Sequence, residues 1–110
     1  MQVDVRNEGD IVLVELVGDI DGKTAPEFQA RVLDLVKPLS RIVVSLERVA
    51  FMSSAGLRTM LLIYREAKSK DAKVVLAQVN QDIRRIMSAT GVLPFFVLSD
   101  SMQDAILGMG

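Results

Sequence analysis

One stretch near the middle of the chain decides the fold: Phe51-Met52-Ser53-Ser54-Ala55-Gly56-Leu57. It connects the apolar run at residues 42–44 to a long helical pattern that ends near Lys68. This order is typical of a strand end, a tight loop and the first turn of a helix. The first N–H groups of a helix lack intrahelical partners, and a serine there commonly serves as a cap. An exposed serine hydroxyl at this position can also accept a phosphoryl group.

Composition limits what else the chain can do. Its 110 residues favour one domain, so we predict a single domain over residues 1–110. A net charge of −1 gives no basic surface for nucleic acid and no polybasic segment for an anionic membrane. No apolar run approaches the ~18 residues of a membrane span, and no signal peptide is evident. We therefore expect a cytoplasmic protein that neither binds nucleic acid nor inserts into a membrane.

Catalytic side chains are scarce. The chain has no cysteine and no histidine, which excludes a disulfide, a thiolate nucleophile and a Ser-His-Asp arrangement. No glycine-rich phosphate-binding loop is present. We expect no enzyme activity, no cofactor and no metal.

The segment before the central stretch begins with a predicted β-hairpin. Residues 2–6 alternate in polarity, and residues 11–17 are almost wholly apolar and β-branched. Residues 7–10 have the composition of a turn.

A helix and a strand are predicted next. Thr24 and Glu27 have the spacing of a capping box, and apolar residues then recur at intervals of three and four until Lys37 and Pro38 end the helix. Residues 41–46 form a short apolar strand. Helices that alternate with apolar strands predict parallel strands joined by crossovers.

Between these elements, residues 18–22 form a predicted loop with two carboxylates, Asp19 and Asp21. A metal site would need further ligands, and no third one lies nearby in sequence. We interpret the loop as a solvated turn, with contact to a partner protein left open.

After the central stretch, residues 55–68 predict an amphipathic helix. Steps of about 100° place an apolar arc toward the sheet and a polar arc, which includes Arg58 and Thr59, toward solvent. Leu62 falls inside the polar arc and is a candidate partner contact. The remaining predicted elements are a strand at residues 73–78, a helix from the Asn80 cap to Gly91, a strand at residues 94–98 and a last helix that contains Met102, Ala105 and Ile106.

At this point the chain resembles STAS domains, and among them the bacterial anti-sigma factor antagonists. The resemblance implies an α/β fold: a sheet of four to five strands, with a mostly parallel core and an antiparallel first strand, and about four helices packed mainly on one face. Four patches carry it: Gly18-Asp19-Ile20-Asp21 with Thr24-Ala25-Pro26; Phe51-Met52-Ser53-Ser54-Ala55-Gly56-Leu57; Asn80-Gln81-Asp82-Ile83-Arg84-Arg85; and Thr90-Gly91 with Pro94-Phe95.

The resemblance also implies a mechanism of partner switching in transcription regulation. An unphosphorylated antagonist binds an anti-sigma factor that is also a serine kinase, and thereby releases a sigma factor. The kinase phosphorylates a serine at the N-terminus of the second helix, and the two proteins separate. A serine/threonine phosphatase reverses the modification.

Aligned on the family motif, the phosphorylated serine falls at Ser54, with Ser53 as the alternative. The family commonly has an aspartate before this serine, and here Ser53 replaces it. Ala55 stands where a second hydroxyl residue is frequent. The expected partner-binding residues come from three sources. The resemblance implies Asp21, the helical wheel adds Arg58 and Leu62 on the outward face, and Ser53, Ala55 and Gly56 flank Ser54 in the central stretch.

Other interpretations remain open at the level of sequence. The two serines have the pattern of an ordinary helix cap. The chain could instead be a STAS subunit, never phosphorylated, of a larger regulatory scaffold or of a membrane transport system. A small α/β enzyme is the least favoured possibility.

Overall fold

A computed structural model describes residues 1–109. Its sheet has five strands in the order β1-β2-β3-β4-β5. β1 (Gln2–Glu8) is antiparallel to β2 (Ile11–Val17). β3 (Arg41–Arg48), β4 (Lys73–Ala77) and β5 (Val97–Ser99) then follow in parallel. The predicted fold class is confirmed.

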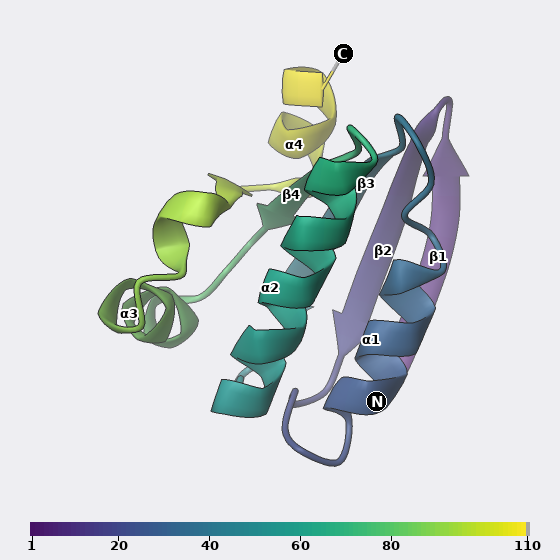
Figure 1. The fold of residues 1–110 in the computed structure, drawn as a ribbon. Coiled ribbons are helices and arrows are strands. Elements are labelled where there is room, and N and C mark those ends of the chain that lie inside the picture. Colours follow the sequence, from purple (N-terminus) through teal and green to yellow (C-terminus); the bar gives the residue numbers. More distant parts are fainter. Residues whose placement is uncertain (110) are drawn as a thin grey trace.

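The helices lie on both faces of this sheet, but unequally (Figure 1). α1 (Ala25–Leu33), α2 (Ser54–Ser69) and α3 (Gln81–Ala89) contribute to one large core, with α1 against α2. α4 (Met102–Met109) packs on the opposite face in a smaller cluster. Three helices on one face agree with the predicted arrangement.

The central strands, β3 and β4, are buried on both faces. Their side chains alternate in direction, and helices cover both faces of the sheet. Val44 and Leu76 face the large core, and Val43 and Val75 face α4. The largest fully buried side chain is that of Phe28 in α1, which has no exposed surface. This apolar packing on two faces fixes the strand register, since a slip by one residue would exchange the two faces.

The hairpin is longer than predicted. Asn7 and Glu8 belong to β1 and pair with Val12 and Ile11, so only two residues form the turn. Gly9 is the first of these and has a φ of 59°. Two-residue hairpin turns need such a left-handed residue, and glycine adopts it without a steric penalty.

Two predicted elements differ from the structure. Helix α1 ends at Leu33, before Lys37, and the chain continues in turns. Residues 94–98 are not one strand: a 3₁₀ helix, η1 (Leu93–Phe95), precedes β5. Pro94 favours this turn because its fixed φ suits a helical start and it has no N–H to donate to a strand.

The helical wheel of α2 also needs one correction. Thr59 was predicted on the polar arc but is buried, with 4% of its surface exposed. Tyr64, on the opposite flank of α2, contacts Phe95 and Phe96, so the Thr59 flank faces α1. A neighbouring helix therefore covers a position that the sheet alone leaves exposed.

Candidate functional site

Two loops meet at the carboxyl ends of β2 and β3. Because β2 and β3 are neighbouring parallel strands, the loops that follow them leave the same edge of the sheet. We call residues 18–24 and 49–53 the site loops. Their backbones are joined in a strand-like manner. Ile20 donates to the Phe51 carbonyl at 3.0 Å and accepts from the Ser53 N–H at 2.8 Å. Ile20 and Met52 form a parallel bridge.

Gly56 allows α2 to approach this joint. A Cβ on Gly56 would lie 2.6 Å from Cγ of Met52, 2.8 Å from Cγ2 of Ile20 and 3.2 Å from the Ile20 carbonyl oxygen. Any side chain at position 56 would therefore push the helix away from the site loops. Gly56 itself lies below the surface.

We expect Gly56→Ala to destabilise the protein. Overpacking costs about 1–3 kcal/mol, whereas alanine gains up to about 1 kcal/mol of helix propensity. The net loss in the free energy of unfolding should be roughly 1–2 kcal/mol, measured by urea denaturation.

Gly108→Ala is the matched control for that change. Gly108 also lies in a helix, α4, but an added Cβ there meets no atom within 4 Å. It should leave the stability unchanged or raise it slightly. Equal effects of the two substitutions would contradict the close-approach role of Gly56.

Ser53 is the N-cap of α2. Its backbone is extended, with φ −81° and ψ 176°, and its Oγ accepts from the Gly56 N–H at 3.4 Å. Its carbonyl accepts the first helical bond, from the Leu57 N–H at 3.0 Å. The hydroxyl of Ser53 is therefore engaged in capping.

Ser54 occupies the first position inside the helix. Its side chain is exposed, and its hydroxyl makes no hydrogen bond to any residue from 1 to 109. The first turn of α2 contains no acidic residue. A negative charge added at Ser54 would face the positive end of the helix dipole and no carboxylate of that turn.

Asp21 organises the other site loop. Its Oδ1 accepts from the N–H groups of Lys23 at 2.9 Å and Thr24 at 3.1 Å. These bonds, together with one from the Thr24 hydroxyl and the nearby Lys23 charge, hold the pKa of Asp21 below its usual value.

The predicted capping box of Thr24 and Glu27 does not form, because the Thr24 hydroxyl donates to the Asp19 carbonyl and accepts from the Asp21 N–H.

This network predicts a pH effect. Since the folded pKa of Asp21 is lowered, its stabilising contribution is complete above the ordinary aspartate pKa of about 3.9. It is lost as the pH falls through the lower folded value. The carboxyl carbon of Asp21, followed by NMR, should titrate below the ordinary midpoint. The stability advantage of the parent over Asp21→Asn should shrink over the same acidic range, and a midpoint at or above the ordinary value would contradict the network.

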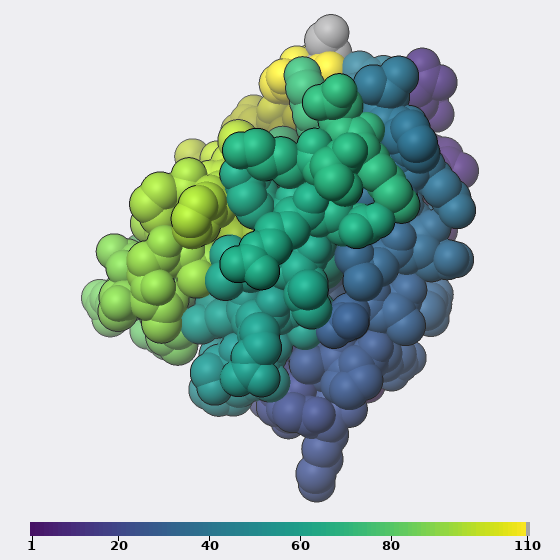
Figure 2. Space-filling model, viewed as in Figure 1, coloured from purple at the N-terminus to yellow at the C-terminus, as the bar shows by residue number. Residues whose placement is uncertain are grey.

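An exposed stripe follows α2 outward from the site loops. Ser54, Arg58 and Leu62 are spaced by four residues, share one helix face, and are all exposed. Phe51, in the loop just before, is 48% exposed, and Leu62 is 41% exposed. We call Phe51, Ser54, Arg58 and Leu62 the α2 stripe. In the space-filling view α2 lies at the centre of the visible face, between α1 and the yellow-green α3 and η1 (Figure 2).

The structure thus separates the predicted site residues into two groups. Arg58 and Leu62 are on the surface as expected, and Asp21 is beside the helix start, because Ile20 bonds to Ser53. Ala55 is half-buried and Gly56 is buried, so both support the site from beneath. Phe51 was not predicted as a surface residue, since an aromatic residue next to apolar Met52 has the pattern of the core.

Asn80 was predicted only as a helix cap, and the structure gives it a second role. Its Oδ1 accepts from the Ile83 N–H at 2.8 Å, as a cap does. Its Nδ2 donates to the carbonyls of Val49 at 3.1 Å and Ala50 at 3.3 Å. The start of α3 is therefore bonded to the loop that carries Phe51 and Ser53.

Metal and membrane features are not found in the part of the chain that the structure describes. Residues 1–109 contain no group of three or more acidic, histidine or cysteine side chains placed to hold a metal ion. None of the helices described is both long and apolar enough to cross a bilayer.

Comparison with known proteins agrees with this geometry. A family model described as the STAS domain matches residues 2–105. BtrV of Bordetella bronchiseptica is 29% identical over 91 residues, which are 82% of this chain and 78% of that protein. The anti-sigma F factor antagonist of Paenibacillus polymyxa is 22% identical over 108 residues, which are 96% of this chain and 92% of that protein.

Solved structures share the fold. An anti-sigma factor antagonist from Mycobacterium paratuberculosis has a TM-score of 0.82 at 26% identity, covering 97% of this chain and 92% of that one. The phosphorylated form of the Bacillus cell fate determinant SpoIIAA has a TM-score of 0.74 at 18% identity, covering 99% of this chain and all of that one. Since the family model matches nearly the whole length, the chain belongs to the STAS domain family.

Proposed function

We propose that this protein is an anti-sigma factor antagonist that acts in the cytoplasm and is switched by phosphorylation of Ser54. Unphosphorylated, it binds an anti-sigma factor with serine kinase activity and thereby releases a sigma factor. The kinase phosphorylates Ser54 and the complex separates; a serine/threonine phosphatase restores the active form. The observation that carries the proposal is the free, exposed hydroxyl of Ser54 at the start of α2.

The choice of Ser54 over Ser53 rests on their hydrogen bonds. The Ser53 hydroxyl caps α2, so modification there would remove a bond that the helix uses. The Ser54 hydroxyl has no such bond among the described residues, so phosphorylation costs the fold no hydrogen bond. The helix N-terminus also favours an added anion.

The switch would act through the interface. A phosphoserine carries about −1.5 to −2 charges at neutral pH. A partner pressed against the α2 stripe would bury this charge, and an unpaired buried charge costs several kcal/mol. Each ~1.4 kcal/mol changes affinity tenfold, so a single phosphate can release the partner. The protein needs no catalytic groups of its own for this, since the kinase performs the transfer.

The test is phosphorylation in a purified system. The chain is incubated with ATP and a candidate anti-sigma factor of the serine-kinase type, and the product is analysed by intact-mass and peptide mass spectrometry. We expect one phosphate, on Ser54, and loss of the complex in gel filtration. A complex that persists with no phosphate incorporated would overturn the switch.

A pull-down separates the second candidate, a STAS subunit of a larger regulatory scaffold or of a membrane transport system. Ser53 in place of the usual aspartate, and the exposed Leu62, favour that role. Recovery of scaffold or transport subunits in a pull-down, with no kinase, would support it.

A further inference from the structure

A cavity of about 510 Å³ lies toward the other end of α2 from Ser54. It exists because β5 is short: the first β5 residue, Val97, pairs with Val75, so Lys73 and Val74 have no β5 residue beside them. The last turns of α2, η1 and the end of α4 surround this open edge. Its volume is in the range of small-molecule sites.

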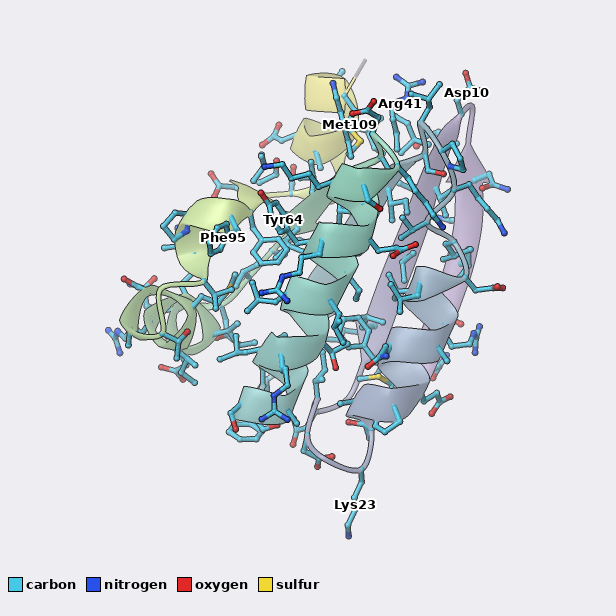
Figure 3. The ribbon with its side chains drawn as sticks, viewed as in Figure 1. Asp10, Lys23, Arg41, Tyr64, Phe95 and Met109 are labelled. Atoms are coloured by element: carbon cyan, nitrogen blue, oxygen red, sulfur yellow. The ribbon has the colours of Figure 1, made fainter. Side chains whose placement is uncertain are left out.

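The walls of the cavity are mainly apolar and aromatic. The Tyr64 and Phe95 rings lie 5.3 Å apart, tilted by 45°. Figure 3 shows these two side chains next to each other between α2 and η1. Phe95 is 50% exposed and Val97 is 63% exposed, so apolar surface remains open to solvent. The other apolar lining residues are Ala67, Ala72, Val74, Val75 and Met109.

The charged residues of the cavity favour an anion. Lys68 and Lys73 line it, against one carboxylate, Asp71, so the lining carries a net positive charge. Within residues 1–109 neither lysine forms an ion pair. The Lys68 ammonium lies 5.8 Å from the centre of the Tyr64 ring and 3.5 Å from its hydroxyl, at the apolar wall.

The dipole of α2 limits how many negative charges a ligand of this cavity can carry. The cavity lies at the C-terminal end of α2, where the helix dipole is negative and repels anions. A polyphosphate would meet this field without a helix N-terminus or glycine-rich loop to hold it. A single carboxylate matches the net charge of +1 that Lys68, Lys73 and Asp71 give the lining.

We propose that this cavity binds a small monocarboxylate with a flat apolar body, such as an arylalkanoate. The body packs on Tyr64, Phe95 and Val97, and the carboxylate lies near Lys68 and Lys73. This inference is independent of the function proposed for Ser54, because it concerns the opposite end of α2 and needs no partner protein.

The test is a titration of the isotope-labelled full chain with phenylbutyrate, followed by amide NMR. We expect saturable shifts confined to residues around the cavity, with Ser54 unaffected. Phenylbutanol should bind more weakly, and phenylbutylamine, of the same shape but opposite charge, should bind most weakly. Equal binding of the amine, or shifts that spread over the chain without saturating, would overturn the proposal.

Substitutions identify the charged contacts. Combined Lys68→Gln and Lys73→Gln should weaken phenylbutyrate binding on the order of tenfold, as loss of charge-assisted contacts implies. Lys23→Gln is the control, because Lys23 extends into solvent from the loop before α1, far from the cavity (Figure 3). Amide spectra of the free variants check that each is folded. If the double variant binds like the parent, the carboxylate does not contact these lysines and the proposal is overturned.

Discussion

Ser54→Asp is expected to weaken binding of the anti-sigma factor about a hundredfold or more. The substituted carboxylate stands at the exposed start of α2, where the partner would have to bury it unpaired. Stability should be unchanged or slightly higher, since a negative charge at a helix N-terminus is favourable. Titration calorimetry measures the affinity, and thermal unfolding measures the stability.

Two alanine variants separate the roles of the neighbouring serines. Ser54→Ala should bind the partner like the parent but take up no phosphate. Ser53→Ala should lose about 1 kcal/mol of stability through the missing cap, while still being phosphorylated. If phosphate incorporation disappears in Ser53→Ala and persists in Ser54→Ala, the modified residue is Ser53. Parent-like affinity of Ser54→Asp would contradict the switch itself.

The second large effect is expected from the apolar members of the α2 stripe. Phe51→Asp and Leu62→Asp should each weaken partner binding about a hundredfold, because each replaces an apolar contact with a carboxylate that the partner would have to bury unpaired. Both side chains are about half exposed in the free protein, so folding should be little affected. The measurement is again calorimetry, with circular dichroism to confirm the fold.

Leu107→Asp is the control for these two variants. Leu107 is more exposed, at 71%, but lies on α4, which packs on the opposite face of the sheet. It should bind the partner like the parent. Equal loss in all three variants would indicate a general effect of added charge, and no loss in Phe51→Asp and Leu62→Asp would place the interface elsewhere.

Most element types and their order could be predicted from periodicity, whereas the packing of the helices mainly on one face was implied by the resemblance to STAS domains. Long apolar runs such as residues 11–17 and the spacing of apolar residues in α2 gave the right element types and order. The wrong predictions concern positions where the local pattern is compatible with more than one structure. Pro94 and Phe95 are apolar enough for a strand but form a 3₁₀ turn. Thr59 is polar but buried, on the flank of α2 that faces α1, and only the three-dimensional arrangement shows that packing.

The candidate site was less predictable because its geometry is long-range. The serine at the start of α2 is a local pattern and could be located. Asp21, Asn80 and Phe51 differ: their roles depend on which segments lie beside them. The two N–H bonds of Asp21 lie within its own turn, which is a local pattern of aspartate, but its place beside the start of α2 depends on the bond between Ile20 and Ser53. An asparagine cap gives no sign of its bonds to the carbonyls of Val49 and Ala50.

The strand-like joint between Ile20 and the segment from Phe51 to Ser53 has a consequence for protein engineering. Transplanting only the serine loop and the start of α2 onto another STAS scaffold would separate this loop from the backbone it is bonded to. In a recipient with a different residue at position 20, the side chain that packs against the Gly56 backbone would have a different shape from that of Ile20. The two site loops and Gly56 should therefore be exchanged together, and a chimera that is to keep partner preference also needs Ser54, Arg58 and Leu62 of the α2 stripe.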